Sequence, residues 1–475
     1  MFAMTTKDQL LARLEPYGQQ HVLKFWDELS ADQRQRLADQ VRSIELESLD
    51  ALLRSDEAGE DWAALARRAV APPAFRLHTD SDHISREEAR QQGERELRAG
   101  RLGVIIVAGG QGTRLGFDAP KGMYPIGPVS GASLFQILVE KVVALRRRYK
   151  VHIPLYVMTS PATHAPTVSF FAEHERFGLP SEDLKIFSQG TMPAVDARTH
   201  RLLLSAKDSL ALSPDGHGGT LEALERSGSL ADMKRRGLKH LFYLQVDNPL
   251  TAVGDPAFVG YHVLSGSELS TAVKAKVAAE EKVGNVVSVD GCVRIIEYSD
   301  LPAEAACRQC EDGSLELWAG NIAVHVFDVD FLQRVSGDSS RLPLHRARKK
   351  VPYLDATGCK MAPHEPNAIK FERFIFDLLP AARHAIVVEV DARRTFAPLK
   401  NASGSGDSSP EAVRRQMVAL AIEWLREAGA TVAEGVAVEI SPLFALDADE
   451  VRARIPPSLN VHQPLYLGEI SNRRK

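Results

Sequence analysis

The chain has 475 residues, which is enough to bury a large core, and its length predicts two or three domains. Its hydrophobic content of 44% and its charged content of 25% are typical of a soluble globular protein. The formal net charge of −4 excludes the overall positive charge that draws proteins to nucleic acid or to anionic membranes. We therefore expect neither nucleic acid nor membrane as a partner.

Targeting signals and cysteines point to the same compartment. No hydrophobic run approaches the roughly 20 residues that a membrane-spanning helix needs, and residues 1–7 contain no apolar signal-peptide core. The chain has 4 cysteines; Cys307 and Cys310 have CxxC spacing, but no second pair or nearby histidine completes a zinc site. We expect reduced thiols and a cytoplasmic protein.

The first part of the chain, residues 1–99, is predicted to be helical. Ser30 with Gln33 and Ser85 with Glu88 have the spacing of capping boxes, which begin helices. This region contains no motif with a chemical role of its own. We expect it to be a structural appendage of a catalytic domain.

The most informative stretch follows directly. Val104–Ala108 is a run of apolar, mostly β-branched residues, typical of a buried strand, and it opens into the glycine-rich loop Gly109–Gly116. Such loops turn backbone N–H groups around an anion, because glycine has no Cβ in the way. Arg114 and Lys121 add fixed positive charge. The stretch therefore predicts a site for the phosphates of a nucleotide.

Two better-known phosphate loops do not fit this stretch. A P-loop needs glycine followed by lysine and then serine or threonine, and a dinucleotide fingerprint needs a third glycine that opens into a helix. The chain has Leu115 where that third glycine would stand. The next predicted helix begins only near Ser133, so the connection is long, as functional loops are.

From Arg101 to about Val390, predicted strands alternate with predicted helices, which favours a mostly parallel sheet covered on both faces. The strands are expected at 104–108, 155–158, 185–187, 241–246, 271–273, 293–297, 322–326 and 386–390, and helices at 134–149, 165–177 and 219–226. In such sheets ligands bind beyond the carboxyl ends of the strands. Both the glycine-rich loop and Asp247 follow predicted strands.

Asp247 allows two interpretations. A carboxylate at a strand end near a phosphate loop suits Mg²⁺, which takes one or two carboxylates together with phosphate oxygens and water. Alternatively, Asp247 makes an Asx-turn ahead of Asn248 and Pro249. Residue type alone favours neither.

The remaining segments are predicted to be structural. The basic runs Arg146–Arg148 and Arg346–Lys350 are expected to be solvated faces in or beside helices. Residues 402–409 are a short flexible linker, and Ser409 caps a helix that begins at Pro410. The tail contains short strand patterns with turn residues, which predicts a small C-terminal α+β module.

At this point the chain resembles a known family. Ala108–Gly116 together with Pro120–Tyr124 is similar to the signature of the eukaryotic-type UDP-N-acetylhexosamine pyrophosphorylases, within the wider UDP-sugar pyrophosphorylase (uridylyltransferase) family. Further segments match in the same order: 189–193, 214–219, 246–248, 293–299, 319–321, 366–376 and 398–401. The resemblance covers residues 93–401, and the collinear motifs make it specific to the family.

The resemblance implies a fold, an activity and a cofactor. The fold would be a Rossmann-like, mostly parallel mixed sheet of the nucleotide-diphospho-sugar transferase (GT-A-like) type, in a catalytic domain at 100–396, with a small C-terminal α+β domain at 397–475. The activity would be transfer of a uridylyl group from UTP to a sugar-1-phosphate, most directly N-acetylglucosamine-1-phosphate. Mg²⁺ would assist, with Mn²⁺ as a substitute. The partners would be these small molecules, with the chain a monomer or weak homo-oligomer.

The family's functional residues can be carried onto matching positions of this chain. Arg114, Lys121 and Lys400 would be catalytic; Ala108, Gly109, Gly110, Gln111, Gly112, Gln189, Gly216 and Asp247 would bind the nucleotide, with Asp247 also on the metal. Lys370 would bind the sugar phosphate, and His217, Gly284, Glu297, Tyr298, Asn321, Phe374 and Phe376 would line the sugar pocket. His217 departs from the family's pattern, which has asparagine there, so the resemblance leaves the preferred sugar open; a plain turn residue is the alternative.

Three rival functions remain. The same chemistry could use glucose-1-phosphate or a galactose-type sugar. A non-catalytic sugar-nucleotide sensor would keep the fold without the metal, but Arg114, Lys121 and Asp247 together argue against it. An NAD-binding oxidoreductase would need the missing third glycine and an acidic ribose partner about twenty residues past the loop.

Overall fold

A computed structural model describes residues 6–54, 61–77, 83–337, 342–456 and 458–469. The contacts within it group the chain into two compact units. Unit 1 is formed by residues 1–61, 189–219 and 342–375, and unit 2 by residues 62–188, 220–341 and 376–475. The three consecutive segments expected from the sequence stay a prediction, because this grouping follows contacts rather than chain order.

Unit 2 is built on a ten-stranded mixed sheet in the described part of the chain, with order β1-β19-β11-β14-β10-β2-β3-β4 and with β12 and β13 attached beside β14. The strands are β1 (Ala74–Phe75), β2 (Leu102–Val107), β3 (Leu155–Thr159), β4 (Leu184–Ser188), β10 (His240–Gln245), β11 (Leu269–Ala275), β12 (Asn285–Val289), β13 (Cys292–Ile296), β14 (Ala319–Asp328) and β19 (Ala385–Glu389). Each strand expected from the sequence is present, with ends shifted by up to three residues.

Strand direction decides which residues meet at one edge of this sheet. β10, β2, β3 and β4 are parallel, and so are β1, β19 and β11, whereas β14 runs antiparallel to both β10 and β11. The first residues of β14 therefore lie at the same edge as the carboxyl ends of β2 and β10. The expected α/β class with a mostly parallel mixed sheet is confirmed.

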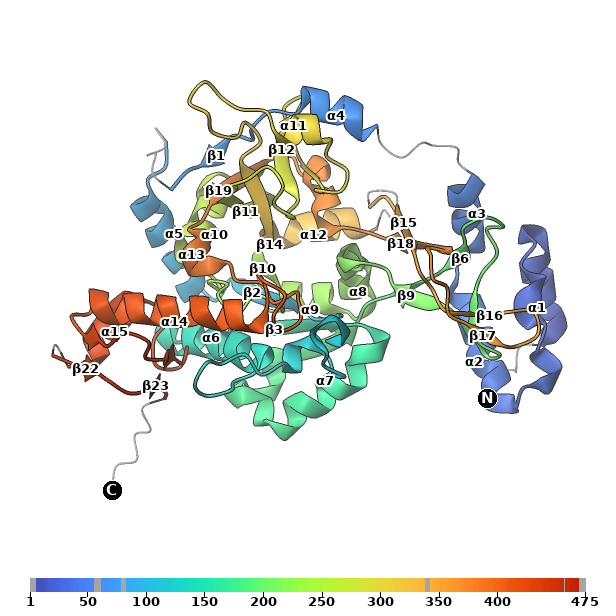
Figure 1. The fold of residues 1–475 in the computed structure, drawn as a ribbon, viewed down its shortest axis with the longest axis horizontal. Helices are drawn as coiled ribbons and strands as arrows, with labels where there is room; N and C mark the ends of the chain where they lie inside the picture. Colours follow the sequence, from blue (N-terminus) through green and yellow to red (C-terminus); the bar gives the residue numbers. More distant parts are fainter. Residues whose placement is uncertain (1–5, 55–60, 78–82, 338–341, 457, 470–475) are drawn as a thin grey trace. The chain divides into compact units, whose positions relative to one another are not determined.

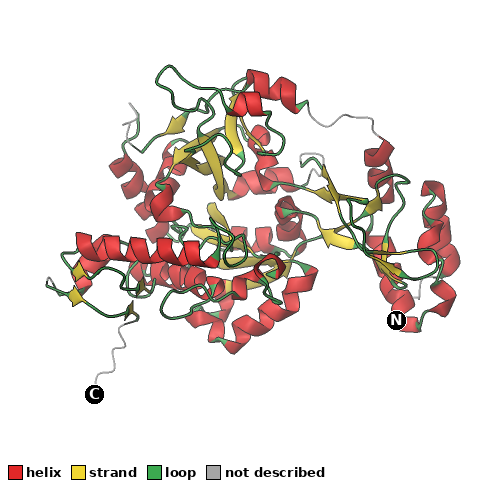
Figure 2. Ribbon diagram, in the orientation of Figure 1, coloured by secondary structure: helices red, strands yellow, loops and turns green. Residues whose placement is uncertain are grey.

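Helices cover the two faces of the sheet (Figure 2). The helices of unit 2 are α4 (Trp62–Arg68), α5 (Arg86–Arg98), α6 (Leu134–Tyr149), α7 (Pro161–Glu173), α8 (Thr220–Arg226), α9 (Ser229–Arg235), α10 (Pro256–Leu264), α11 (Ala303–Ala306), α12 (Val329–Ser336), α13 (Ala392–Thr395), α14 (Pro410–Glu427) and α15 (Ala448–Arg454). Val104 and Ile106 join the core cluster with α5, α6 and α10. On the opposite face, the Tyr156 hydroxyl donates to Asp232 of α9.

Unit 1 combines the first helices with short strands from two distant parts of the chain. Its elements are α1 (Lys7–Leu14), α2 (Ala31–Ser43), α3 (Leu46–Arg54), β5 (Thr191–Pro193), β6 (Val195–Asp196), β7 (Leu204–Ala206), β8 (Ser209–Leu210), β9 (Leu212–Pro214), β15 (His345–Lys349), β16 (Tyr353–Leu354), β17 (Lys360–Met361) and β18 (Ala368–Glu372). Leu10, Trp26 and Leu37 share one apolar cluster with Leu210 and Phe371. Hydrophobic burial thus joins segments that lie far apart in sequence.

The C-terminal residues of unit 2 form a small layer around α14 and α15. Short parallel strand pairs, β20 (Thr431–Val432) with β22 (Asn460–Val461) and β21 (Val438–Ile440) with β23 (Leu465–Leu467), accompany the two helices. α14 lies alongside α6 (Figure 1). Its cap at Ser409, first residue Pro410 and end at Glu427 are as predicted.

The structure corrects several local expectations. The helix predicted at 165–177 runs from Pro161 to Glu173, because Ser160 caps it and Phe177 has left the helical conformation. Residues 74–75, expected to be helical, form the short strand β1.

The run Arg146–Arg148 in α6 is only partly a solvated face. Arg147 is exposed, whereas Arg146 is half-buried and pairs with Asp183, and Arg148 pairs with Asp447 and Glu450. The run 346–350 lies largely in strand β15. Its basic residues are exposed, so this run is a solvated face as expected, in a strand rather than a helix. Ion pairs with residues distant in sequence, which residue type alone does not encode, decide the positions of Arg146 and Arg148.

The four cysteines are all exposed and free, as expected. Within the described residues, every helix is too short or too polar to cross a lipid bilayer.

Candidate active site

The glycine-rich loop leaves β2 and folds back on itself. The Ala108 N–H donates to the carbonyl of Met158 in β3 (2.7 Å), which fixes the start of the loop to the sheet. Further along, Gly112 N–H donates to Ala119 (2.9 Å) and Lys121 N–H donates to Gly110 (3.0 Å). These bonds close the loop without an α-helix, and the long connection to α6 has its own defined structure, with 3-10 turns at Thr113–Leu115 and Lys121–Met123.

The loop leaves its glycines and its arginine accessible. Gly110, Gln111 and Arg114 are exposed, whereas Ala108 and Gly112 are buried. A Cβ placed on Gly110 would meet nothing within 4 Å. The exposed segment therefore has the room to receive phosphate groups, with a guanidinium beside it.

Asp247 and Lys121 meet at the carboxyl edge of the sheet. Asp247 follows β10 by two residues, and its Oδ2 lies 3.6 Å from Nζ of Lys121. Asp247 is 8% exposed. Parallel pairing of β2 with β10 brings the two strand ends side by side, so the closeness follows from the sheet topology.

Asn248 ties the Asp247 segment to the chain before Lys400. Its Nδ2 donates to the carbonyl of Thr395 (2.8 Å), and its Oδ1 accepts from the N–H groups of Leu250 and Ala397. The Leu399 N–H donates to the Asp247 carbonyl (2.8 Å). Asn248 therefore makes the Asx-turn considered for Asp247, and the carboxylate of Asp247 is left for other interactions.

The residues present fit a magnesium ion that is completed by substrate. In the described part of the chain, no group of three or more His, Cys, Asp or Glu side chains is arranged to hold a metal. Mg²⁺ needs no such cage, since it takes one or two carboxylates and fills its remaining positions with water and phosphate oxygens. Asp247 has a carboxylate of the required kind, at the edge of the sheet where Lys121 and the glycine-rich loop lie.

A second group of predicted residues gathers around the start of β14. Asn321 N–H donates to the Gly284 carbonyl (2.8 Å), and a Cβ on Gly284 would lie 3.0 Å from a carboxylate oxygen of Glu297. An amide and a carboxylate thus lie beside a glycine, a combination suited to sugar hydroxyl groups. Tyr298 is 48% exposed and Phe376 is buried.

In unit 1 the loop 214–219 is held from inside. Gln189 Nε2 donates to Asp215 Oδ1 (2.8 Å) and to the Gly216 carbonyl (3.0 Å). Asp215 is 3% exposed, and its carbonyl accepts the Arg373 N–H. Gly216 has φ +82°, and a Cβ there would lie 2.4 Å from the Arg373 carbonyl oxygen.

His217 lies in the same loop and takes part in its folding. The Ile375 N–H donates to Nδ1 of His217 (3.2 Å), and the ring stacks on Phe374 at 5.3 Å. Burial lowers the pKa of His217 to about 4, and the neighbouring His345 acts in the same direction. The ring is therefore neutral at pH 7, with its hydrogen on Nε2, since Nδ1 accepts.

The structure thus places the predicted site residues in two sets. Unit 2 holds the phosphate loop, Lys121, Asp247, Lys400, Gly284, Glu297, Tyr298, Asn321 and Phe376, and unit 1 holds Gln189, Gly216, His217, Lys370 and Phe374. Lys400 is exposed, and its N–H donates to the Ser408 carbonyl. Lys370 lies in β18, opposite Ala347 of β15.

Two residues that hold predicted site residues in place were not themselves predicted from the sequence. Asp215 anchors Gln189, and Asn248 joins the Asp247 segment to residues 395–397. Asp215 stands directly beside a glycine-rich stretch and Asn248 directly before a proline, both common turn contexts. That signal suggests a turn, but the tertiary partner that makes each residue matter is distant in sequence.

Comparison with known proteins gives a consistent result. Residues 56–423 match the protein family described as UTP–glucose-1-phosphate uridylyltransferase. UDP-N-acetylglucosamine pyrophosphorylase of Saccharomyces cerevisiae is 38% identical over 89% of this chain and 92% of its own length. UDP-N-acetylhexosamine pyrophosphorylase-like protein 1 of Homo sapiens is 36% identical over 98% of this chain and 94% of its own length.

Solved structures agree on the fold. A putative UDP-N-acetylglucosamine pyrophosphorylase from Entamoeba histolytica superposes with a TM-score of 0.74 at 32% identity, covering 80% of this chain and 96% of that one. The uridine diphosphate N-acetylglucosamine pyrophosphorylase from Trypanosoma brucei superposes with a TM-score of 0.80 over 98% of this chain, at 23% identity.

The family match and the relatives show that the chain is a nucleotidyltransferase, of the kind that transfers uridylyl groups. More particularly, the chain belongs to the UTP–glucose-1-phosphate uridylyltransferase family, as the match over most of its length shows.

Proposed function

We propose that the protein makes UDP-N-acetylglucosamine and pyrophosphate from UTP and N-acetylglucosamine-1-phosphate. The observation that carries the chemistry is the meeting of Lys121 with Asp247 beside the closed glycine-rich loop. The choice of sugar is supported by the names of the relatives that align over nearly the whole chain.

The reaction is an in-line displacement. An oxygen of the sugar phosphate attacks the α-phosphorus of UTP, the new P–O bond forms, and the bond to the bridging oxygen breaks so that pyrophosphate leaves with the electron pair. No covalent enzyme intermediate is needed, so the protein's work is alignment and neutralisation of charge.

Each proposed residue has a place in this scheme. Arg114 and Lys121 would meet the phosphates of UTP, and Lys400 the phosphates at the reaction centre. Gln189 and Gly216 would meet the uracil edge. Lys370 would hold the sugar phosphate.

The sugar itself would be bound mainly by polar groups near β14. Glu297 and Asn321 beside Gly284 would bind its hydroxyl groups, and Tyr298, Phe374 and Phe376 its ring and N-acetyl methyl group. A neutral His217 would donate one hydrogen bond through Nε2.

Asp247 would hold Mg²⁺, or Mn²⁺ as a substitute. When bound, the ion supplies positive charge to the phosphate oxygens as the pyrophosphate leaves. Asp247 is suited to this because Asn248 occupies the neighbouring turn bonds.

The test is pyrophosphate release from UTP against a panel of sugar-1-phosphates, with and without chelator. We expect N-acetylglucosamine-1-phosphate to give the highest kcat/KM, activity to vanish with chelator and return with Mg²⁺, and Asp247→Asn to abolish it or sharply raise the metal requirement. An unchanged metal dependence in Asp247→Asn would remove the metal role from this residue. A preference for glucose-1-phosphate would select the closest rival function.

We further infer a cytoplasmic protein that works as a monomer or weak homo-oligomer. Gel filtration with light scattering over a range of concentrations tests the second point, and a stable higher oligomer would contradict it.

A further inference from the structure

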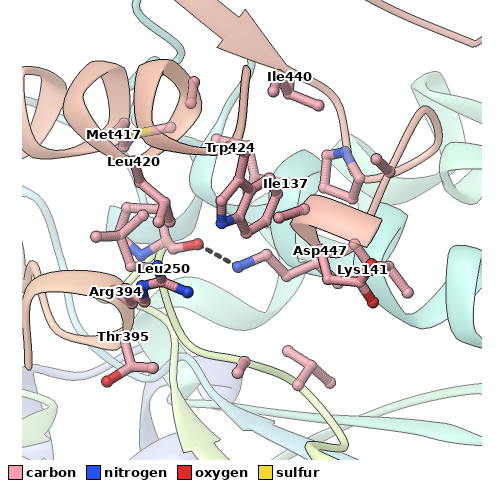
Figure 3. Close-up of a pocket in the computed structure, with 18 of the residues that line it drawn as sticks. Ile137, Lys141, Leu250, Arg394, Thr395, Met417, Leu420, Trp424, Ile440 and Asp447 are labelled. Carbon is pink, nitrogen blue, oxygen red and sulfur yellow. Dashed lines mark hydrogen bonds between the residues drawn. The ribbon is translucent and has the colours of Figure 1, made fainter. Parts of the chain in front are cut away.

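Unit 2 contains a cavity of about 480 Å³ away from the glycine-rich loop. It lies between α6, α14, the C-terminal layer and the segment that follows Asp247 (Figure 3). We call it the α6–α14 cavity. Its volume is within the range of sites for small organic molecules.

The walls of the α6–α14 cavity are largely apolar. Ile137 of α6, Leu250, and Met417, Leu420 and Trp424 of α14 line it. An indole next to branched aliphatic side chains favours an occupant with an aromatic or branched apolar group, since burying that group removes apolar surface from water.

The carboxylates that line the cavity are already engaged. Glu140 accepts from Gln136 and Ser441, and Glu439 accepts from the backbone at 129–130. Asp255 caps α10. These bonds leave the acidic groups satisfied within the protein.

The cations that line the cavity differ in whether a carboxylate of the protein pairs with them. Arg148 pairs with Asp447 and Arg394 with Glu427, while Arg86 is exposed. Within the described residues, Lys141 is the partly buried cation of this lining that pairs with no carboxylate. It donates to two neutral acceptors, the carbonyls of Pro249 (2.6 Å) and Thr251 (2.8 Å).

The two carbonyl acceptors are neutral, so the Lys141 ammonium has no counter-ion in the part of the chain that the structure describes. Burial lowers the pKa of Lys141 to about 7, which is the cost of placing an ammonium among protein atoms without a counter-ion. A carboxylate brought into the cavity would supply that counter-ion through a charge-assisted hydrogen bond.

The cavity walls continue into the candidate active site. Pro249 and Leu250 lie two and three residues after Asp247, and Arg394 and Thr395 line the cavity just before the segment that leads to Lys400. Asn248 bonds the Thr395 carbonyl. A displacement of the Lys141 ammonium would therefore act on the segment after Asp247 through its hydrogen bonds to the carbonyls of Pro249 and Thr251.

We propose that the α6–α14 cavity binds a small amphipathic monocarboxylate, with its apolar group against Trp424 and Leu420 and its carboxylate on Lys141, and that binding slows uridylyl transfer. The carboxylate accepts the third N–H of the Lys141 ammonium and draws the ammonium away from the carbonyls of Pro249 and Thr251, which loosens the segment that follows Asp247. The second half of this proposal rests on the proposed function; the first does not.

The binding test uses 3-phenylpropionate and, as a matched uncharged probe, 3-phenylpropan-1-ol, titrated calorimetrically into the full chain. We expect the acid to bind at least about tenfold more tightly, because only it makes a hydrogen bond between charges. Lys141→Met should remove that difference, and Leu420→Trp should fill the cavity and abolish binding of both probes. Lys234→Met, an exposed lysine on α9, is the control and should behave as wild type.

Equal affinity for acid and alcohol in wild type, or acid binding that survives Leu420→Trp, overturns the site. Leu420→Trp carries the test if Lys141→Met does not fold.

The coupling test measures turnover at saturating 3-phenylpropionate. We expect kcat to fall about fivefold, within the usual range of allosteric coupling, with the KM for UTP unchanged, and no effect in Leu420→Trp. A raised KM with constant kcat would place the probe in the UTP site and contradict the proposal, and binding without any kinetic effect overturns the coupling. If the chain transfers no uridylyl group to any sugar phosphate, calorimetry still decides the site, and hydrogen exchange at residues 247–251 takes the place of turnover.

Discussion

Two glycine-rich loops contain residues that we propose for substrate binding, and the two loops use glycine for different reasons. In the loop 109–116 of unit 2, Gly110 is exposed and has open space where a side chain would be. In the loop 214–219 of unit 1, Gly216 lies against the backbone of Arg373 in a left-handed conformation.

The comparison shows that one residue type can serve ligand access in one loop and close packing in another. Loop 109–116 keeps room for a ligand, whereas loop 214–219 is filled by its own protein contacts. A side chain at Gly110 should therefore change activity first, and a side chain at Gly216 should change stability first.

The largest expected effect is a loss of catalytic efficiency when a cation of the loop 109–116, or of the segment that follows it, is removed. Arg114→Ala or Lys121→Ala should lower kcat/KM by about 30- to 1000-fold, since lost transition-state contacts of this kind cost roughly 2–4 kcal/mol. Unfolding of Arg114→Ala in urea should change little, because Arg114 is exposed. Lys234→Ala serves as the control for loss of a positive charge. Near-normal turnover in both variants would remove the phosphate role from this loop.

The second effect separates the two loops by stability. Gly216→Ala should lower the free energy of unfolding by about 1–3 kcal/mol, because its Cβ meets the Arg373 carbonyl and its φ of +82° is strained for alanine. Gly110→Ala should leave unfolding unchanged and lower turnover instead. Urea titrations and pyrophosphate release, measured on both variants, check this. Equal effects of the two variants in both assays would erase the difference between the loops.

The third effect is a pH dependence confined to the second loop. The folded pKa of His217, about 4, lies below its usual value of 6.5, so the unfolded chain takes up the proton first. Stability should therefore fall as the pH drops from 6.5 towards 4, by about 3 kcal/mol, and His217 should contribute little above pH 6.5. His217→Asn should lack this part of the acid sensitivity in urea titrations. Parallel pH curves for the two proteins would show that His217 does not titrate in this way.

The smallest effect concerns the sugar. His217→Asn restores the residue of the resembling family and should change relative kcat/KM several-fold among N-acetylglucosamine-, N-acetylgalactosamine- and glucose-1-phosphate, because a neutral hydrogen bond contributes roughly 0.5–1.5 kcal/mol. The KM for UTP should stay nearly fixed. Unchanged ratios with a shifted KM for UTP would place His217 with the nucleotide instead.

Much of the fold follows from local pattern. The apolar run before Gly109 and the capping serine at 133 predict β2 and α6, and the structure has both, with α6 at 134–149 as expected. Period and capping are encoded within a few residues, so they can be recognised without tertiary knowledge. The motifs that match in the same order indicated the family and, with it, the class of reaction.

The pairing of distant segments could not be predicted in this way. Arg146 and Arg148 belong to a run that has the composition of a solvated face, yet both are drawn into ion pairs with distant carboxylates. Asn248 looks like an ordinary turn residue until Thr395 and Ala397 lie beside it. Such contacts depend on which surfaces come together. The sequence around a charged or amide side chain is the same whether that side chain is solvated or paired with a distant residue.

The sequence by itself therefore determined the alternation of strands and helices, the position of the glycine-rich loop after β2 and the uridylyltransferase family, because these depend on short-range spacing. Only the tertiary structure decided that Lys121 meets Asp247, that Asn248 rather than Asp247 makes the turn, and that Lys141 faces a cavity without a carboxylate partner. The physical reason is that an interaction energy depends on the distance between two groups and on the water removed from around them. Both quantities are fixed only when the sheet aligns its strand ends and the helices cover it.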